Sequence, residues 1–550
     1  MNQTVNFFLK NGFLIAPDAF NRMDSDFDKI SFLERLKKKT YFENLLLINQ
    51  DVSTMVWRER GVKINWIEFD NSRVMLEKNK EAETYNTFLS MFDYDVSEEK
   101  QEEITQIMEE VTYDQKEAEI SDEKDKSNGS VVIVKSYNED SRKRDLNDFV
   151  SYFKKRYDFL KDLLLNRQEL QDVISIKRLL SRDKTEKGKI SLIGLVYEKS
   201  VTKNGNIILK VEDKTGMTSL IITKNNKELF DIGNDIVLDE VIGINGYSMD
   251  RVVFVNNIYF PDIPLTKELK KSKEVTYVAF ISDLHVGDSL FLEEDFENFL
   301  EWINGNCEGE EKEIVDKIEY LFIPGDTVAG IGIYPGQEED LTIKDINKQY
   351  QKFSEYMDRI PCRIKIIICA GNHDALRISE PQPQLEKNYL NDLYKKENVF
   401  FVTNPSLVNI HSSKDFEGFD VLIYHGYSIP YFADNVESIR AAGGQDRSDL
   451  VLKFLLQRRH LAPTHTSNLY VPDPIQDHLL IDRIPDFFIT GHIHRMASIN
   501  YRNITALNCG CWVKQSEDQK KRGIVPDPSK AFLINLQTRE IKIKNFGKNG

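Results

Sequence analysis

Five short segments rich in histidine and aspartate occur in a fixed order through the second half of the chain. Each follows an apolar run such as Tyr277 to Ile281 or Ile364 to Cys369, which is typical of a buried strand. Open α/β sheets gather their functional groups at the carboxyl ends of such strands. The pattern therefore predicts an α/β domain whose polar side chains meet at one edge. The segments are Asp283-Leu284-His285, Gly325-Asp326, Gly371-Asn372-His373-Asp374, His425-Gly426 and Gly491-His492-Ile493-His494.

These donors favour a centre with more than one metal ion. Carboxylate and imidazole groups suit divalent cations such as manganese, iron or zinc, and the set is too large for one tetrahedral ion. Two ions about 3.5 to 4 Å apart can clamp the attacking and leaving oxygens of a phosphoryl displacement, and the pair needs a bridging carboxylate. Asp326, at a predicted strand end, is the expected bridge. Histidine usage agrees, because all nine histidines lie from His285 to His494 and five of them fall in the segments.

The order D-x-H, G-D, G-N-H-D, H and G-H-x-H resembles the calcineurin-like metallophosphoesterase superfamily. Carried over position by position, the resemblance implies a first metal site made of Asp283, His285, Asp326 and His494. It implies a second site made of Asp326, Asn372, His425 and His492. His373 matches a histidine that binds no metal and protonates the leaving oxygen, a role that suits an imidazole near neutral pH. Asp374 is expected to orient His373.

The residues around the motifs are more specific than the ligands. Residues 325–341 and 371–383 resemble the small subunit of archaeal family D DNA polymerase, as do Tyr424 to Gly426 and Gln519 to Pro526. Two places depart from that family, Ala329 and the run Cys509 to Trp512, and neither holds an implied ligand.

This resemblance implies a proofreading 3′–5′ exonuclease that supports DNA replication. It would use two divalent ions, with manganese favoured and iron or zinc as alternatives, and would release 5′-nucleotides from single-stranded DNA 3′ ends. The polymerase site would lie on a large subunit, so a heterodimer is implied. Arg377 is the expected DNA contact, although an arginine there could instead pair with Glu380.

Three other functions compete with this one. A DNA-repair nuclease of the same superfamily would act on broken duplex ends and would not need a barrel before the catalytic domain. A protein phosphatase is disfavoured because residues 325–331 depart from the corresponding motif of that group. A catalytically inactive structural polymerase subunit is disfavoured because all the ligand positions are intact.

Length and composition fit several domains in one cytoplasmic protein. The 550 residues exceed one ordinary domain, and no apolar run reaches the roughly 18 residues of a membrane span. The amino terminus lacks the pattern of a secretion signal, and the five cysteines have no disulfide-framework spacing. The net charge of -16 argues against a protein that coats nucleic acid indiscriminately.

The first part of the chain divides into three predicted pieces. Residues 1–65 show helical apolar spacing and predict a small helical domain for contacting a partner. Residues 66–138 predict a flexible acidic linker, since Glu98 to Lys126 holds twelve acidic residues against four basic ones. Residues 139–182 predict a long helix from about Arg142, whose apolar face is expected to pack on the next domain. The residues of that face are Leu146, Phe149, Val150, Phe153, Tyr157, Leu160 and Leu164.

The remaining chain predicts an all-β module followed by an α/β domain. Residues 183–264 contain five strand-like runs and a helix-like insert near Lys227, which suits an OB-fold barrel or a small unrelated one. Because aromatic residues are few there, a DNA-binding surface and a structural platform remain equal alternatives. Residues 265–550 predict a calcineurin-like phosphoesterase domain, in which two packed sheets form an α/β sandwich covered by helices.

Overall fold

The computed structural model describes residues 3–20, 23, 27–39, 47–48, 52–53, 56, 69, 130–137, 142–182, 188–249, 252–521 and 523–547. The chain forms two compact units, residues 1–127 and 128–550. The described elements of the first unit are helices α1 (Gln3–Lys10), α2 (Pro17–Phe20) and α3 (Lys29–Lys39), with β1 (Leu14–Ile15) paired in parallel to β2 (Leu47–Ile48). Phe8 and Phe32 are fully buried in it. The prediction of a helical partner-binding domain over 1–65 stays a prediction, because much of that range lies outside the described residues.

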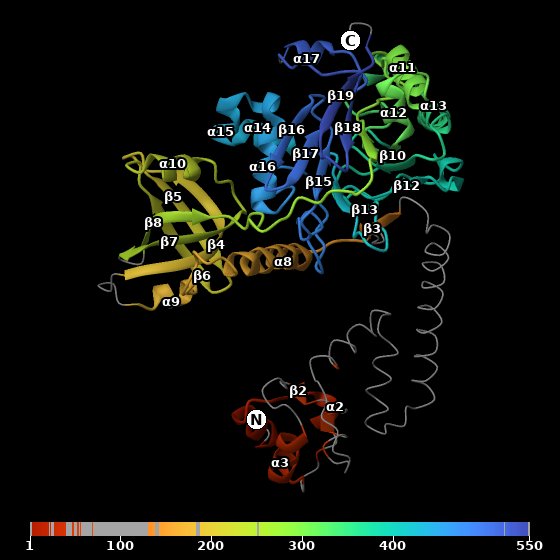
Figure 1. Cartoon of the computed structure of the whole chain (residues 1–550). Coiled ribbons are helices and arrows are strands. Elements are labelled where there is room, and N and C mark those ends of the chain that lie inside the picture. Colours follow the sequence, from red (N-terminus) through yellow and green to blue (C-terminus); the bar gives the residue numbers. More distant parts are fainter. Residues whose placement is uncertain are drawn as a thin grey trace. The chain divides into compact units, whose positions relative to one another are not determined.

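The second unit contains two six-stranded sheets that pack face to face (Figure 1). The first sheet has the order β12-β11-β10-β9-β18-β19. The four strands from β12 at the edge to β9 run parallel to one another. Its strands are β9 (Tyr277–Phe280), β10 (Ile318–Pro324), β11 (Lys365–Cys369), β12 (Val399–Phe401), β18 (Lys530–Asn535) and β19 (Ile541–Asn545). Parallel pairing places the carboxyl ends of β9, β10 and β11 at one edge, where the polar motifs follow them.

The second sheet has the order β16-β17-β15-β14-β13-β3. Within it β14, β15 and β17 run parallel, so the carboxyl ends of β14 and β15 also share an edge. Its strands are β3 (Val131–Lys135), β13 (Ser406–Ile410), β14 (Phe419–Ile423), β15 (Phe487–Thr490), β16 (Ala497–Tyr501) and β17 (Ile504–Asn508).

Apolar side chains from both sheets fill the layer between them, including Phe280, Phe322, Val421 and Phe487. Helices cover the two outer faces. One face carries α11 (Glu293–Ile303), α12 (Glu310–Asp316), α13 (Ile346–Asp358) and the short turn η3 (Leu393–Lys395), and the turn η2 (Gln337–Glu339) lies in the loop between β10 and α13. The other carries α14 (Ile429–Asn435), α15 (Glu437–Ala442), η4 (Gly444–Arg447) and α16 (Ser448–Arg458), and α17 (Glu517–Lys521) lies in the loop before β18. The predicted α/β architecture of two packed sheets with outer helices is confirmed.

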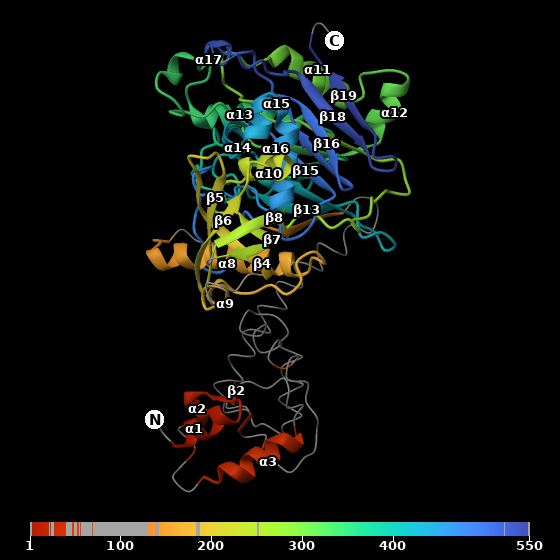
Figure 2. The ribbon, with the colours of Figure 1, turned by 90° about the vertical axis from the view of Figure 1, so that its left-hand side faces the viewer.

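A closed five-stranded barrel lies in the chain between β3 and the other strands of these sheets (Figure 2). Its order is β4-β5-β6-β8-β7, and α10 (Lys227–Asn234) lies between β6 and β7. The strands are β4 (Gly188–Val201), β5 (Ile207–Asp213), β6 (Gly216–Ile222), β7 (Val241–Met249) and β8 (Val252–Tyr259). Five strands with a helix after the third fit the predicted module, and its identity as an OB fold stays a prediction.

The predicted long helix over 139–182 is shorter than expected. It is α8 (Leu146–Leu165), which begins after Asp145, because the Asp145 carboxylate accepts hydrogen bonds from the first-turn amides of Asn147 and Asp148. A separate short helix, α9 (Ile176–Leu180), follows. Tyr157, Leu160 and Leu164 pack on the barrel as predicted, but Leu146 is 78% exposed, since the barrel covers only the second half of the helix.

The predicted linker over 66–138 ends earlier than expected. Residues 131–135 form β3, which pairs antiparallel with β13 at the edge of the second sheet. The run Val131-Val132-Ile133-Val134 has high strand propensity, and the open edge of β13 supplies its backbone partners. Residues 70–129 lie outside the described residues, so the acidic tether itself stays a prediction. Among the described helices, none is long and apolar enough to cross a membrane.

A buried ion pair fastens α8 to the α/β domain. Arg156 Nε donates to Asp477 Oδ2 at 2.7 Å, and Arg156 Nη1 donates to the Pro463 carbonyl at 2.8 Å. His460 Nε2 lies 2.8 Å from the same Asp477 oxygen, so this histidine is a satisfied structural residue. These contacts hold α8, which packs on the barrel, against the α/β domain.

Candidate metal centre

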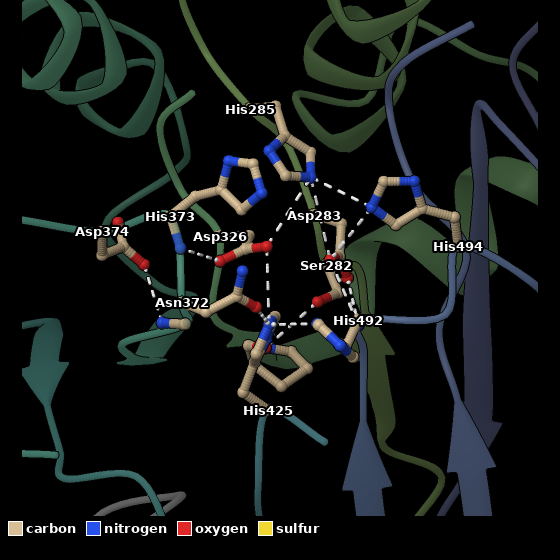
Figure 3. A network of polar contacts seen from close by, with 12 residues as sticks. Ser282, Asp283, His285, Asp326, Asn372, His373, Asp374, His425, His492 and His494 are labelled. Carbon is tan, nitrogen blue, oxygen red and sulfur yellow. Dashed lines mark hydrogen bonds and ion pairs between the residues drawn. The ribbon is translucent and has the colours of Figure 1, made fainter. Parts of the chain in front are cut away.

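The implied ligands converge on one place, at the meeting edges of the two sheets (Figure 3). Asp283 and His285 follow β9, and Asp326 follows β10. Asn372 and His373 follow β11. From the second sheet, His425 follows β14, and His492 and His494 follow β15. Buried parallel strands thus bring together side chains that are more than 200 positions apart.

Several of these residues have a left-handed backbone conformation. The φ angles are 53° for Asp283, 52° for His285, 49° for Asp326, 71° for His492 and 59° for His494. Residues other than glycine seldom adopt positive φ, and each instance costs on the order of 1 kcal/mol. Five such residues at one place indicate that the fold strains its backbone to aim these side chains inward.

Two motif glycines are required by close approach. A Cβ at Gly371 would collide with Oδ1 of Asp326, and a Cβ at Gly491 would collide with Oδ2 of Asp283. Any larger residue would place its Cβ atom too close to a carboxylate of the cluster, so both positions require glycine.

The first group of donors contains Asp283, His285 and His494. Oδ1 of Asp283 lies 3.4 Å from Nε2 of His494 and 3.9 Å from Nε2 of His285. The Asp283 carboxylate also accepts the amide hydrogen of His492, at 2.9 Å to Oδ2. These contacts hold the carboxylate between the two rings.

The second group contains Asp326, His425 and His492. Nε2 of His425 lies 3.4 Å from Oδ2 of Asp326, 2.9 Å from Oδ1 of Asn372 and 3.2 Å from Nδ1 of His492. Nδ1 of His425 faces the Pro324 carbonyl at 2.8 Å, which fixes the ring and leaves Nε2 directed at the cluster. The same Oδ2 of Asp326 lies 3.7 Å from Nε2 of His285, so Asp326 stands between the two groups.

His373 lies beside both groups, with its ring centroid 4.5 Å from that of His285. Its Nδ1 donates to the Ala329 carbonyl at 2.8 Å, which leaves Nε2 to carry a mobile proton. A third group of possible donors combines His373 with His285 and Asp326, so the geometry also allows His373 to reach a metal.

The predicted role of Asp374 differs from its observed contacts. Its carboxylate accepts from the Gly371 amide at 2.8 Å and from the Tyr350 hydroxyl at 3.2 Å, and it also contacts the Thr327 hydroxyl. Asp374 therefore holds the loop that carries His373, while the Ala329 carbonyl orients the imidazole. A backbone acceptor has no side-chain signature, so this contact could not be predicted from the sequence.

Arg377 is engaged outside this cluster. Its Nη2 donates to the Pro381 carbonyl at 2.8 Å, and its guanidinium lies 5.2 Å from the ring centroid of Tyr137. The alternative partner Glu380 instead accepts from the Tyr424 hydroxyl at 3.0 Å. A DNA contact by Arg377 stays a proposal. It would have to use N–H groups of the guanidinium other than the one that donates to Pro381.

Two histidines of the cluster have raised pKa values, and two others have lowered ones. Burial lowers the pKa of His425, but Asp326 and Asp283 outweigh burial and raise it to about 10. Burial also lowers the pKa of His494, while Cys511 and Asp283 raise it well above the usual value. His285 and His492 are different, because burial and neighbouring histidines lower the pKa of each to about 3. Both carboxylates keep lowered pKa values through these contacts.

This donor set fits divalent cations. Buried carboxylates require a compensating positive charge nearby. Neutral imidazoles and ionised carboxylates are the ligands that such cations take, and Asn372 adds an amide oxygen. Gln519, whose side chain lies 3.3 Å from Nδ1 of His494, is an outer partner of one of these rings. Its contact was missed because Gln519 lies on α17, outside the five motif segments and 25 positions after His494.

Comparisons with known proteins agree with this geometry. The family model described as calcineurin-like phosphoesterase matches residues 276–496. The chain is 38% identical over 406 residues to the DNA polymerase II small subunit of Methanothermobacter thermautotrophicus, which covers 74% of this chain and 80% of that protein. It is 39% identical over 396 residues to the protein of the same name from Methanocaldococcus jannaschii, and the match covers 71% of this chain and 64% of that protein. The corresponding protein of Pyrococcus abyssi is 37% identical over 405 residues, which cover 72% of this chain and 63% of that protein. The match therefore spans less than two thirds of the length of these last two relatives.

Proposed function

Because the chain belongs to the family of archaeal DNA polymerase II small subunits, we propose that it is the 3′–5′ exonuclease of a heterodimeric replicative DNA polymerase. The observation that carries this proposal is the convergence of Asp283, Asp326 and their histidine partners around one point, with His373 beside them. A proofreading role requires a large partner chain that holds the polymerase site, and the names of the relatives support such a partner.

The two donor groups would each hold one cation. The first would use Asp283, His285, Asp326 and His494, and the second Asp326, Asn372, His425 and His492. Two divalent ions, when bound, polarise a phosphodiester and lower the pKa of water. Manganese is the favoured ion, with iron or zinc as alternatives, because nitrogen and oxygen donors accept all three.

The residues around the cations would supply position and a proton. Nδ1 of His373 donates to the Ala329 carbonyl, so the proton that His373 delivers comes from Nε2. Its acceptor would be the 3′ oxygen of the nucleotide that stays on the strand, which leaves the phosphate on the released 5′-nucleotide. Asp374 holds the Gly371 amide and thereby the loop under His373.

The test is cleavage of single-stranded DNA by the purified chain, alone and with its large subunit, in manganese. Strands labelled at either the 5′ or the 3′ end distinguish polarity. The proposal expects a ladder of 5′-labelled products that shorten from the 3′ end, and early release of the label from 3′-labelled strands. Complete absence of cleavage in both preparations would favour a structural subunit, and cleavage only of broken duplex ends would favour a repair nuclease.

A further inference from the structure

A loop with an exposed apolar tip borders the metal centre. It runs over residues 329–340, directly after the segment that carries Asp326. Its tip presents Ile331, Ile333 and Tyr334, whose exposed fractions are 48%, 36% and 42%. Large apolar side chains that are exposed side by side, next to a polar site, commonly contact a ligand.

Two buried glutamines hold this loop in one conformation. Gln337, 1% exposed, accepts from the Ile333 amide at 2.9 Å and donates to the Ala329 carbonyl at 2.9 Å. Gln349, fully buried, accepts from the Gly330 amide at 2.9 Å and donates to the Gly330 carbonyl at 3.2 Å. The tip is therefore a rigid surface, and binding a ligand there costs little ordering entropy.

Both ends of the loop are attached to residues of the centre. The Ala329 carbonyl that accepts from Gln337 also accepts from Nδ1 of His373. At the other end the Ser289 amide donates to the Asp340 carbonyl at 2.8 Å, only four residues after His285. Ile331 is two residues from Ala329, so their Cα atoms are at most about 8 Å apart.

Negative charge next to the tip of the loop favours a neutral ligand group over a phosphate. Glu338, Glu339 and Asp340 follow the tip, and the Tyr334 hydroxyl donates to Asp340 at 2.9 Å. These carboxylates repel a phosphate. A neutral aromatic base has no such penalty and can stack on a tyrosine ring flanked by aliphatic side chains.

We propose that the tip formed by Ile331, Ile333 and Tyr334 is a nucleobase subsite, which stacks on the base of the nucleotide bearing the leaving 3′ oxygen. This inference rests on the proposed exonuclease function, because His373 identifies the leaving side of the scissile bond. The loop shares the Ala329 carbonyl with His373, so its tip lies on that side. The subsite recognises a base in a single strand without reading its identity, since every base has a stacking face.

The test combines removal of the tyrosine ring with removal of the base. Single strands carry a normal nucleotide, or an abasic analogue, at the penultimate or at the terminal position. We expect Tyr334→Ala to lower kcat/KM about tenfold on the normal strand, as loss of one stacked base does. On the strand that is abasic at the penultimate position, the same variant should change kcat/KM by less than about twofold. Tyr334→Phe keeps the ring and should behave as the parent.

A second readout does not require cleavage. A strand with 2-aminopurine at the penultimate position and a non-cleavable methylenephosphonate at the scissile linkage should lose fluorescence on binding, because stacking quenches this base. Tyr334→Ala should abolish the additional quenching, and Tyr334→Phe should retain it. Ile543→Ala, which removes an apolar side chain that is 58% exposed on β19, is the control for a general surface effect and should change neither readout.

The possible results separate this subsite from the nuclease itself. The proposed subsite would be overturned, with the exonuclease intact, if Tyr334→Ala lowered kcat/KM equally on normal and abasic strands. It would also be overturned if the effect of Tyr334→Ala depended only on the terminal base. Unchanged cleavage and quenching in Tyr334→Ala would also overturn it. If the parent cleaves none of the strands but shows quenching that depends on Tyr334, the base contact stands and the proposed nuclease function fails.

Discussion

Nε2 of His285 lies 3.0 Å from Nε2 of His494, although the two residues are 209 positions apart in the chain. Two imidazole nitrogens that face each other at this distance can share only one proton. A divalent cation can accept the lone pair of each, with Asp283 between them. The pair therefore fits a site in which a bound cation takes the place of the shared proton.

Metal binding should release protons at neutral pH. The pKa of His425, raised to about 10 by Asp326 and Asp283, means that this ring is protonated in the metal-free protein at pH 7.5, and the pKa of His494 is also raised. His285 and His492, with pKa values of about 3, are already neutral and release none. We therefore expect the release of at least one proton per chain, from His425, and metal affinity that rises with pH up to its pKa of about 10. Titration calorimetry with manganese in buffers of different ionisation enthalpy measures this number, and zero release would contradict the assigned charges.

Asp326→Asn should remove metal and activity together. Oδ2 of Asp326 faces His425 and His285, so this carboxylate serves both donor groups. We expect the variant to retain less than about half of the bound metal, since a bridging charge is lost from both sites. Metal content after dialysis, measured by plasma mass spectrometry, checks this. Asp482→Asn, which alters a carboxylate paired with Lys135, is the matched control, and parental metal content in Asp326→Asn would refute the bridge.

His373→Ala should separate metal binding from catalysis. Loss of a general acid lowers kcat by about 10² to 10⁴-fold, while the donors of both metal groups remain. The variant should therefore bind manganese as the parent does and cleave DNA far more slowly. His465→Ala removes a histidine paired with Asp239 and serves as control. Loss of one ion from His373→Ala would instead make His373 a ligand, as the third donor group allows.

The sequence was sufficient to predict the family, and the structure brings the predicted site residues close together. Each ligand directly follows an apolar run, so local patterns placed Asp283, Asp326 and His425 at strand ends, and the resemblance to polymerase small subunits was confirmed by the relatives. The orientation of His373 could not be predicted, because it depends on a backbone carbonyl. Positive φ angles at residues such as His285 also leave no pattern, since they are imposed by tertiary contacts.

Long-range pairing explains the errors in the amino-terminal half. The Val131 to Lys135 run sits after an acidic segment, and its partner β13 is more than 250 positions away, so composition alone assigned it to a linker. Helical periodicity predicted a helix here but not the bounds of α8, and it could not tell how much of its apolar face the barrel covers. Leu146 is exposed for this reason, while Leu164 is fully buried.

Arg156→Leu should destabilise the second unit. It removes one partner of a buried ion pair and leaves the Asp477 carboxylate uncompensated, which costs about 3 to 5 kcal/mol. Burial raises the pKa of Asp477, but Arg156 and His460 outweigh burial and lower it, so the charge is present at neutral pH. The urea midpoint should fall in Arg156→Leu and recover in part in the double variant with Asp477→Leu. An unchanged midpoint in the single variant would show that this pair does not fasten α8.

The most direct test of the centre is anomalous diffraction from crystals of the chain grown with manganese. We expect two peaks, one among Asp283, His285, Asp326 and His494, and the other among Asp326, Asn372, His425 and His492. A crystal structure with no peak among these side chains, at manganese concentrations that support cleavage, would contradict the two-metal centre on which the proposed nuclease depends.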